Sequence, residues 1–241
     1  MMSSNRIATT VWTRLKQLLL QAYGLCIRVR VKGEGRIAVP LHRHFIVAAN
    51  HLTGADSLVI QLALRTRLFF VTSARWLATR FTGFFMSNIC DSVPADTGAG
   101  FENLAGVRKC VRTLESGGSI GIYPEGRLNR EGRVDRIENG AAWLAARTGT
   151  PILPVYVRNL KLGPEPWSRP WLSEAWEGFF SVVGNLLNTD IEVVVGEPIA
   201  PLEGAAKDPD SLRSEVERLN IELRRSFDLL AEPRVVDGLS I

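Results

Sequence analysis

Short apolar runs alternate with stretches of helical periodicity along most of the chain. An apolar run bounded by polar residues or glycines is typical of a strand buried on both faces, whereas apolar residues spaced three and four apart are typical of amphipathic helices. The pattern predicts strands over 26–32, 45–49, 68–72, 119–123, 152–157 and 191–195, and helices over 56–64, 99–116, 137–147 and 211–230. This alternation indicates an α/β fold, a single domain with a mainly parallel sheet flanked by helices.

The N-terminal region has an amphipathic pattern of its own. Apolar residues between positions 7 and 25 fall near helical spacing, with basic residues among them. A membrane-spanning helix needs about 20 apolar residues, and the stretch shows neither that length nor the pattern of a cleaved signal peptide. We predict an amphipathic helix over 1–25 and the main domain over 26–241. The helix could pack on the core of the domain or lie on an anionic lipid surface as an anchor.

Composition and charge narrow the class of partner. The 241 residues include 29 Lys and Arg against 25 Asp and Glu, a net charge of +4. This modest basic excess suits an anionic lipid surface or a phosphate-bearing substrate at least as well as a nucleic acid, and we expect no nucleic-acid partner. The three cysteines and three histidines are too few and too scattered for a disulfide framework or a metal motif. We therefore expect no metal site and a reducing compartment.

The sharpest local pattern is the sequence NHLTGAD at 50–56. It follows a predicted buried strand and so lies at the carboxyl edge of the sheet, where α/β proteins bind ligands. On a continuous helix His51 and Asp56 would lie about 140° apart and would not meet. If His51 lies in a turn and Asp56 opens the next helix, the carboxylate can bind the imidazole and leave its other nitrogen free to take a proton. Alternatively, Asp56 only caps the helix and His51 is a loop residue.

A second pattern follows the predicted strand over 119–123. The turn Pro124-Glu125-Gly126 leads into Arg127, and further arginines follow up to position 136. Glycine permits a left-handed backbone or a close approach of the chain, and arginine can hold a phosphate through two parallel bonds. The segment is therefore either an anion-binding edge or a solvated, charge-rich loop.

Two further segments, 76–85 and 171–187, are rich in Trp and Phe and carry few charges. Aromatic side chains gather at membrane interfaces, but they are also common in cores. The two interpretations predict different exposure for a small set of side chains: Trp76, Phe84, Phe85, Trp171 and Phe180.

In combination, these motifs resemble those of the glycerolipid acyltransferase family, which includes the lysophosphatidic acid (1-acylglycerol-3-phosphate) acyltransferases. The HX4D motif of His51 and Asp56, the Pro-Glu-Gly turn and the later block Ile152–Val155 occur in the family's order, and the resemblance runs from about 31 to 159. Two departures stand out. Asp96-Thr97 occupies the place where the family has Asp-Arg, and the arginine after Glu-Gly comes one position early, as Arg127.

The resemblance implies a glycerol-3-phosphate acyltransferase-like fold and an O-acyltransferase of phospholipid or membrane-lipid biosynthesis. It would move a fatty acyl group from an acyl thioester, acyl-CoA or acyl carrier protein, to a hydroxyl of a lysophospholipid-type acceptor. His51 would act as general base paired with Asp56. Glu125, Gly126 and Arg127 would bind the acceptor, and their backbone N–H groups would help to stabilise an oxyanion.

The resemblance also implies no cofactor beyond the thioester co-substrate. The amphipathic N-terminal segment, the two aromatic segments and the lack of a spanning helix predict a peripheral protein, on the cytoplasmic side of the membrane. Two alternatives stay open because of the departures at positions 96–97 and 127. One is an acyltransferase acting on a glycolipid or amino-lipid. The other is a non-catalytic protein of the same fold that binds lipid or acyl carrier protein.

Overall fold

The computed structural model describes residues 17–33, 35, 44–72, 92–94, 104–163 and 174–232. Within these ranges seven strands form one sheet in the order β1-β7-β6-β2-β5-β3-β4. The strands are β1 (Val29–Lys32), β2 (Ile46–Ala49), β3 (Leu68–Thr72), β4 (Val93–Pro94), β5 (Ser119–Ile122), β6 (Ile152–Arg158) and β7 (Ile191–Val195). The helices are α3 (Asp56–Leu64), α5 (Leu104–Glu115), α6 (Gly140–Thr148), α7 (Glu174–Gly184) and α8 (Pro209–Ala231), and residues 17–26 are also helical.

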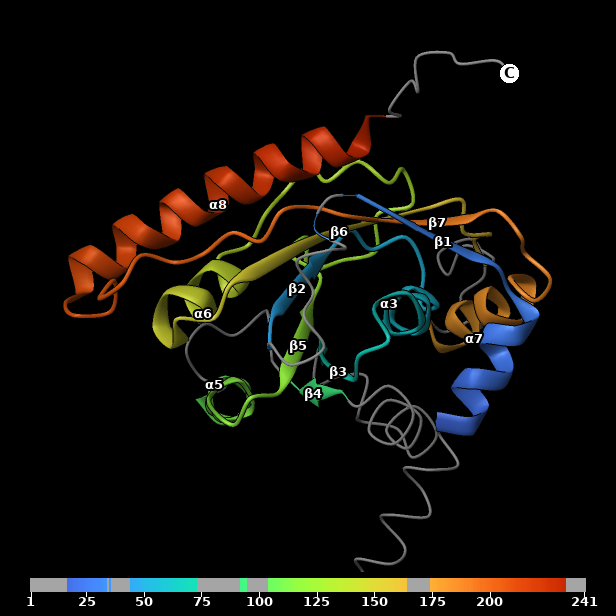
Figure 1. Ribbon diagram of the computed structural model, residues 1–241, viewed down its shortest axis with the longest axis horizontal. Coiled ribbons are helices and arrows are strands. Elements are labelled where there is room, and N and C mark those ends of the chain that lie inside the picture. The colour runs from blue at the N-terminus through green and yellow to red at the C-terminus, as the bar shows by residue number, and fades with distance from the viewer. Residues whose placement is uncertain are drawn as a thin grey trace, which may run out of the picture.

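Helices cover both faces of this sheet (Figure 1). Neighbouring strands are parallel except β6 and β7, which run antiparallel. The helix over 17–26, α3 and α7 lie on one side, and α5, α6 and α8 lie on the other. The predicted α/β class with a mainly parallel sheet is thus confirmed.

The apolar run of β2 shows why the strand is buried on both faces. Ile46 and Ala48 point into the core beneath α5, α6 and α8, while Val47 and Ala49 point into the core beneath α3. All four side chains are buried. A strand between two helical layers has a continuous apolar sequence, because successive side chains alternate between two faces and both faces are buried.

Most predicted elements are present, and the deviations have local causes. The predicted strand over 26–32 is wrong at its start, because Tyr23 O accepts the N–H of Ile27 (3.2 Å) and the helical turn extends through Cys26. The predicted helix over 137–147 begins only at Gly140, because Glu138 N–H donates to Pro124 O (2.8 Å) and holds the preceding residues to that turn. Two elements have no counterpart among the predictions, the short strand β4 and helix α7.

The sheet order brings the two sequence motifs together. β2 lies between β5 and β6, and all three strands are parallel, so their carboxyl ends meet at one edge. The NHLTGAD segment leaves β2 at this edge and the Pro-Glu-Gly turn leaves β5 beside it. No helix in the described ranges is both long enough and apolar enough to cross a bilayer.

Candidate active site

Asn50 ends β2 and sets the path of the chain into the site. Its side chain is fully buried, its Oδ1 accepts the N–H of Val157 (2.7 Å), and its Nδ2 donates to the carbonyl of Val157 (3.0 Å). The amide thus continues the β2–β6 hydrogen bonding with side-chain groups after the backbone has turned away. Because Asn50 precedes His51, the backbone can leave the sheet while the polar backbone groups of β6 keep hydrogen-bond partners.

His51 and Asp56 are in contact. His51 Nδ1 lies 2.9 Å from Asp56 Oδ2, and the same oxygen accepts the N–H groups of Leu52 (2.7 Å) and Thr53 (3.0 Å). Since a carboxylate only accepts, the proton of the neutral imidazole lies on Nδ1 and the lone pair on Nε2. Asp56 opens α3 without capping it, because the N–H groups that it binds precede the helix.

Burial of the Asp56 carboxyl is energetically unfavourable for its charged form. Its side chain has no exposed surface, and Oδ1 has no hydrogen-bond partner among the described residues. Burial raises the pKa of this carboxyl above its ordinary value, although the bonds from His51 and the two backbone N–H groups act in the opposite direction. The His51 side chain, in contrast, keeps 21% of its surface exposed, so the imidazole can meet a substrate.

The ring of Tyr123 covers one face of the imidazole. The ring centroids of His51 and Tyr123 are 3.8 Å apart with an interplanar angle of 6°, and Phe70 stacks on Tyr123 in turn (5.5 Å). The stack therefore holds the plane of the imidazole ring.

Glu125 binds inward, toward the backbone of His51. Its Oε1 accepts the N–H of His51 (3.3 Å) and its Oε2 accepts from Asn129 Nδ2 (2.7 Å), while Asn129 N–H donates to the carbonyl of His51 (2.6 Å). Burial raises the pKa of the Glu125 carboxyl, and the bonds from Asn129 and His51 offset part of that effect. Glu125 is only 4% exposed, so the geometry favours a role in positioning His51 over the predicted contact with the acceptor.

Gly126 and Arg127 lie at the surface of the turn. Gly126 has φ +67°, a left-handed backbone that favours glycine, and its N–H donates to Tyr123 O (3.0 Å). That N–H is therefore occupied, which is a correction to the expectation that it helps to bind an oxyanion. Arg127 is exposed and makes no hydrogen bond or ion pair with the described residues, so its guanidinium is available to a ligand.

The other arginines of the segment serve different purposes. Arg130 donates to Gly163 O (2.6 Å) and pairs with the buried carboxylate of Glu177 (3.3 Å), whereas Arg136 pairs with Glu138 (2.7 Å) at the surface. Of the four arginines in the predicted cluster, Arg130 is in a partly buried ion pair, Arg136 is in a surface pair, and Arg127 and Arg133 are exposed.

Comparison with known proteins decides the family. The model of the family described as Acyltransferase matches residues 28–158, which is more than half of the chain and includes both motifs.

The chain belongs to the Acyltransferase family.

Individual relatives agree with this acyltransferase assignment. The chain is 27% identical over 140 residues to a 1-acyl-sn-glycerol-3-phosphate acyltransferase of Borreliella burgdorferi, covering 55% of this chain and 52% of that protein. It is 33% identical over 49 residues to a chloroplastic 1-acyl-sn-glycerol-3-phosphate acyltransferase of Brassica napus, covering 20% of this chain and 14% of that protein. The matches thus span at most about half the length of these relatives.

The fold is also that of a solved acyltransferase. The crystal structure of the 1-acyl-sn-glycerophosphate (LPA) acyltransferase PlsC from Thermotoga maritima superposes with a TM-score of 0.58 and 18% identity. The superposition covers 100% of this chain and 86% of PlsC. The two proteins therefore share the arrangement of sheet and helices.

Several expectations for this chain lie outside the described residues. Asp96-Thr97, which stands at the family's glycerophosphate block, is among them, as are Trp76, Phe84, Phe85 and Trp171. Of the aromatic side chains on which the two interpretations differ, Phe180 is described and is 43% exposed. At this position the core interpretation is wrong, because the side chain lies at the surface.

The chain also contains one Gly-x-Ser-x-Gly sequence, Gly117–Gly121. In serine hydrolases such a motif forms an elbow after a strand, with its hydroxyl exposed. Here Ser119 begins β5, is 7% exposed, and accepts the N–H of Phe45 through Oγ (3.2 Å). Since β5 runs parallel to β2, Ser119 lies at the opposite edge of the sheet from His51 and is not a nucleophile for the site.

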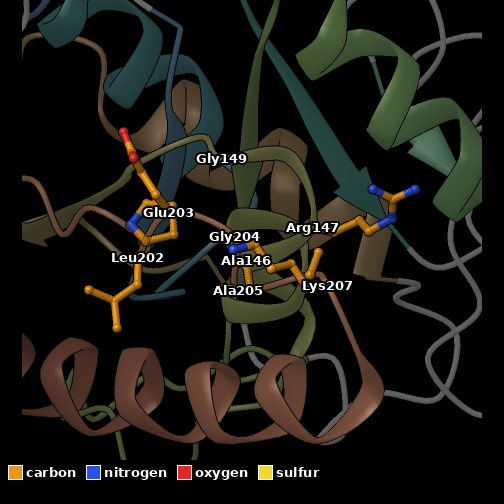
Figure 2. A pocket seen from close by; sticks show the side chains of 10 residues that line it. Ala146, Arg147, Gly149, Leu202, Glu203, Gly204, Ala205 and Lys207 are labelled. Carbon is orange, nitrogen blue, oxygen red and sulfur yellow. The ribbon is translucent and has the colours of Figure 1, made fainter.

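A hollow of about 390 Å³ lies away from the motifs, between the end of α6 and the loop 201–207. Figure 2 shows Arg147, Leu202, Glu203 and Lys207 around it. The end of α6 precedes β6, whereas His51 follows β2 and the two strands are parallel. The hollow is thus at the far edge of the sheet from the acyltransferase motifs.

Three residues support the site in roles that were not predicted from the sequence. Asn129 binds both the carbonyl of His51 and the carboxylate of Glu125, Tyr123 stacks on the imidazole, and Glu177 Oε2 accepts the N–H of Gly54 (3.1 Å) within the HX4D loop. Asn129 and Tyr123 lie close to the Pro-Glu-Gly turn in sequence, so proximity to the motif is a usable signal. Glu177 lies 123 residues from Gly54, and no local spacing indicates it.

Proposed function

We propose that this protein transfers a fatty acyl group from an acyl thioester to a hydroxyl of a lysophospholipid-type acceptor, in phospholipid or membrane-lipid biosynthesis. The observation that carries the proposal is the contact between His51 Nδ1 and Asp56 Oδ2 (2.9 Å) at the carboxyl edge of the sheet, with Nε2 left as the basic nitrogen. Family membership and the names of the relatives support the reaction class.

In the proposed reaction His51 is the general base. Nε2 takes the proton of the acceptor hydroxyl as its oxygen attacks the thioester carbonyl, and Asp56 stabilises the imidazolium. The tetrahedral intermediate then expels the thiolate, which takes the proton back from the imidazolium. The step calls for no cofactor, because a thioester carbonyl is already reactive, and either acyl-CoA or acyl carrier protein can supply it.

Arg127 is the proposed contact for a phosphate on the acceptor. Its guanidinium is exposed and follows a turn that leaves β5 next to β2. The relatives' names point to 1-acyl-sn-glycerol-3-phosphate as acceptor. The alternatives are a glycolipid or amino-lipid acceptor, in which case Arg127 makes no phosphate contact.

The proposed place of action is the cytoplasmic surface of a membrane, with the protein attached peripherally. The acceptor is a lipid, and the net charge of +4 favours an anionic surface. The helix over 17–26 supports the attachment, because Leu18, Leu19 and Leu25 are exposed on it while Tyr23 packs against the core.

The test is an assay of thiol release with the purified protein. Acyl-CoA or acyl-loaded carrier protein is combined with a panel of lysophospholipids, glycolipids and amino-lipids. We expect transfer by the wild type and none by His51→Ala. His44→Ala is the matched control, since His44 precedes β2 at the opposite edge of the sheet. If His51→Ala turns over like the wild type, the mechanism is wrong, and if the wild type binds lipid without releasing thiol, the protein is a binding module.

A further inference from the structure

Helix α7 turns its polar side toward the protein. Glu177, Ser181 and, just beyond the helix, Asn185 follow one another at intervals of four, and they are exposed by 1%, 0% and 0%. The opposite side carries large apolar residues that remain exposed: Trp176 (48%), Phe179 (51%), Phe180 (43%) and Val183 (44%). A surface helix in water has the reverse arrangement, with its apolar stripe against the core.

The buried polar side is fully engaged by the rest of the protein. Glu177 Oε2 accepts the N–H of Gly54 (3.1 Å), and Oε1 accepts from Ser181 Oγ (2.8 Å) and pairs with Arg130 (3.3 Å). The Asn185 side chain binds both the N–H and the carbonyl of Lys161. The helix could not rotate to bury its aromatic residues without breaking these buried bonds, so the orientation is specified.

The exposed residues of α7 form a continuous apolar surface, here called the aromatic face (Trp176, Phe179, Phe180 and Val183). The three rings are in mutual contact, with centroid separations of 5.7 to 6.0 Å. Helix 17–26 lies beside α7 (Figure 1), since Tyr23 Oη donates to Val182 O (3.2 Å). Exposed apolar side chains on the two helices and on the turn after α7 are thus close to one another.

The charges around α7 suit an anionic lipid. Of the α7 side chains that the structure describes, Glu177 alone is charged, and it is buried. Two exposed basic residues lie near the end of the helix: Arg28 N–H donates to Asn188 O (2.9 Å), and Lys161 N–H donates to Asn185 Oδ1 (2.9 Å). The nearby Asp190 is paired with Arg30. Trp and Phe with flanking basic side chains are what an interfacial helix presents to an anionic bilayer.

We propose that the aromatic face of α7 is the surface by which this protein docks on an anionic bilayer. The proposal rests on the proposed function in one respect, that acceptor and acyl donor are lipids held at a membrane. Docking there would place the bilayer against the helix whose Glu177 binds the HX4D loop, so that lipid substrates enter beside His51.

The experiment compares two double variants in vesicle sedimentation. Trp176→Ser with Phe179→Ser removes two rings of the aromatic face. Ile221→Ser with Leu229→Ser is the matched control, because these α8 residues are apolar and even more exposed (64% and 62%) but lie across the sheet. With vesicles of phosphatidylcholine and phosphatidylglycerol, we expect the α7 variant to bind about tenfold more weakly or worse, and the control to bind like the wild type.

Three results would overturn the docking proposal. The α7 variant could bind like the wild type, or the control could lose as much. In the third case, the wild type would be a dimer in the absence of vesicles and the α7 variant would be a monomer. The aromatic face would then be a contact between two copies of this chain. Circular dichroism confirms that each variant is folded before it is scored.

A second readout separates docking from catalysis. With a short-chain, water-soluble thioester and acceptor, we expect the α7 variant to keep wild-type turnover, because no membrane is needed. If the wild type transfers no acyl group to any acceptor while vesicle binding still depends on the aromatic face, the proposed function fails and the docking surface stands.

Discussion

Three contacts restrain the imidazole of His51. Asp56 holds Nδ1, the ring of Tyr123 lies flat against one face, and Glu125 with Asn129 binds the backbone N–H and carbonyl of His51. Together they leave Nε2 as the group that can meet a substrate. The arrangement requires two buried carboxyls whose pKa values are raised by burial, and burial of charge opposes folding. Neither buried carboxyl is therefore explained by stability alone.

Asp56→Asn separates catalysis from folding. Asparagine Oδ1 can still accept the N–H groups of Leu52 and Thr53, and the neutral amide avoids the cost of a buried charge. It cannot stabilise an imidazolium, so we expect transfer to fall by about 100-fold or more while the free energy of unfolding changes by less than about 2 kcal/mol. Thiol release measures the rate of transfer, and urea unfolding measures the free energy of unfolding. A loss of folding as severe as the loss of activity would contradict this.

The same residue predicts a pH dependence of stability. Because burial raises the pKa of Asp56 in the folded protein above its ordinary value of 3.8, the folded state holds a proton at pH values where the unfolded state has lost it. Its contribution to stability therefore falls as the pH rises from about 4 through the raised folded value. In urea unfolding across this range, the wild type should lose stability relative to Asp56→Asn as the pH increases. A difference that grows with pH would mean that His51 and the backbone bonds lower the pKa instead.

Arg127→Ala tests the acceptor class. If Arg127 holds a phosphate, the substitution should lower kcat/KM for 1-acyl-sn-glycerol-3-phosphate by about 10 to 100-fold, the worth of a charge-assisted bond. An uncharged acceptor should be unaffected, and stability should not change because the side chain is exposed. Arg136→Ala is the control on the same segment. An equal loss on both acceptors would contradict the phosphate contact.

At the scale of elements, α7 binds the two loops that carry the sequence motifs. Glu177 binds Gly54 in the loop after β2 and Arg130 in the loop after β5. Both loops are irregular backbone, and a buried carboxylate that binds both limits their relative motion. The helix is therefore a support for the site as well as a surface.

Glu177→Ala should accordingly destabilise the protein. It removes the carboxylate of Glu177 from Arg130 and from the N–H of Gly54, and breaking a buried ion pair costs about 3 to 5 kcal/mol. Arg130 is 20% exposed and keeps its bond to Gly163 O, so we expect a loss near the lower end. Glu138→Ala, which removes the surface partner of Arg136, is the control and should cost less than about 1 kcal/mol. Urea unfolding measures the loss of stability in both variants. Equal losses in Glu177→Ala and Glu138→Ala would contradict a structural role for Glu177.

At the scale of the whole molecule, the two sequence motifs lie at one edge of the sheet, and exposed apolar side chains lie on the helices that cover one of its faces. β2 and β5 deliver both motifs to the same edge, and α3, α7 and the helix over 17–26 cover the same face. A lipid bound at a membrane could thus reach His51 from the side on which the aromatic face lies.

Charge should contribute to membrane binding independently of the aromatic face. Residues 1–16 include Arg6, Arg14 and Lys16, and their deletion spares Tyr23, which packs on the core. We expect the deletion to weaken vesicle binding most at low salt, because salt screens the attraction to anionic lipid. The substitutions in α7 should weaken it at all salt concentrations. Equal binding of the wild type to neutral and anionic vesicles would remove the electrostatic part of the argument.

Local patterns were sufficient for most of the secondary structure and for the contact between His51 and Asp56. The bounds of α3, β3 and β7 follow from runs of five to nine residues, because a buried strand and a short helix are each specified by their own apolar spacing. His51 and Asp56 are five positions apart, so a turn into a helix is enough to bring them together. The sheet type follows from the alternation of strands and helices.

Tertiary structure decided which way the remaining side chains point. Glu125 turns inward because its partner, the His51 N–H, lies 74 residues away on the neighbouring strand, and Arg130 is occupied because α7 brings Glu177 beside it. The aromatic residues around position 180 fit a core or a surface equally well by sequence. They are exposed because the polar side of α7 has its partners in other loops of the chain: Gly54 lies 123 residues before Glu177, and Arg130 lies 47 residues before it. Contacts across such separations depend on how the strands are ordered, which no local spacing records.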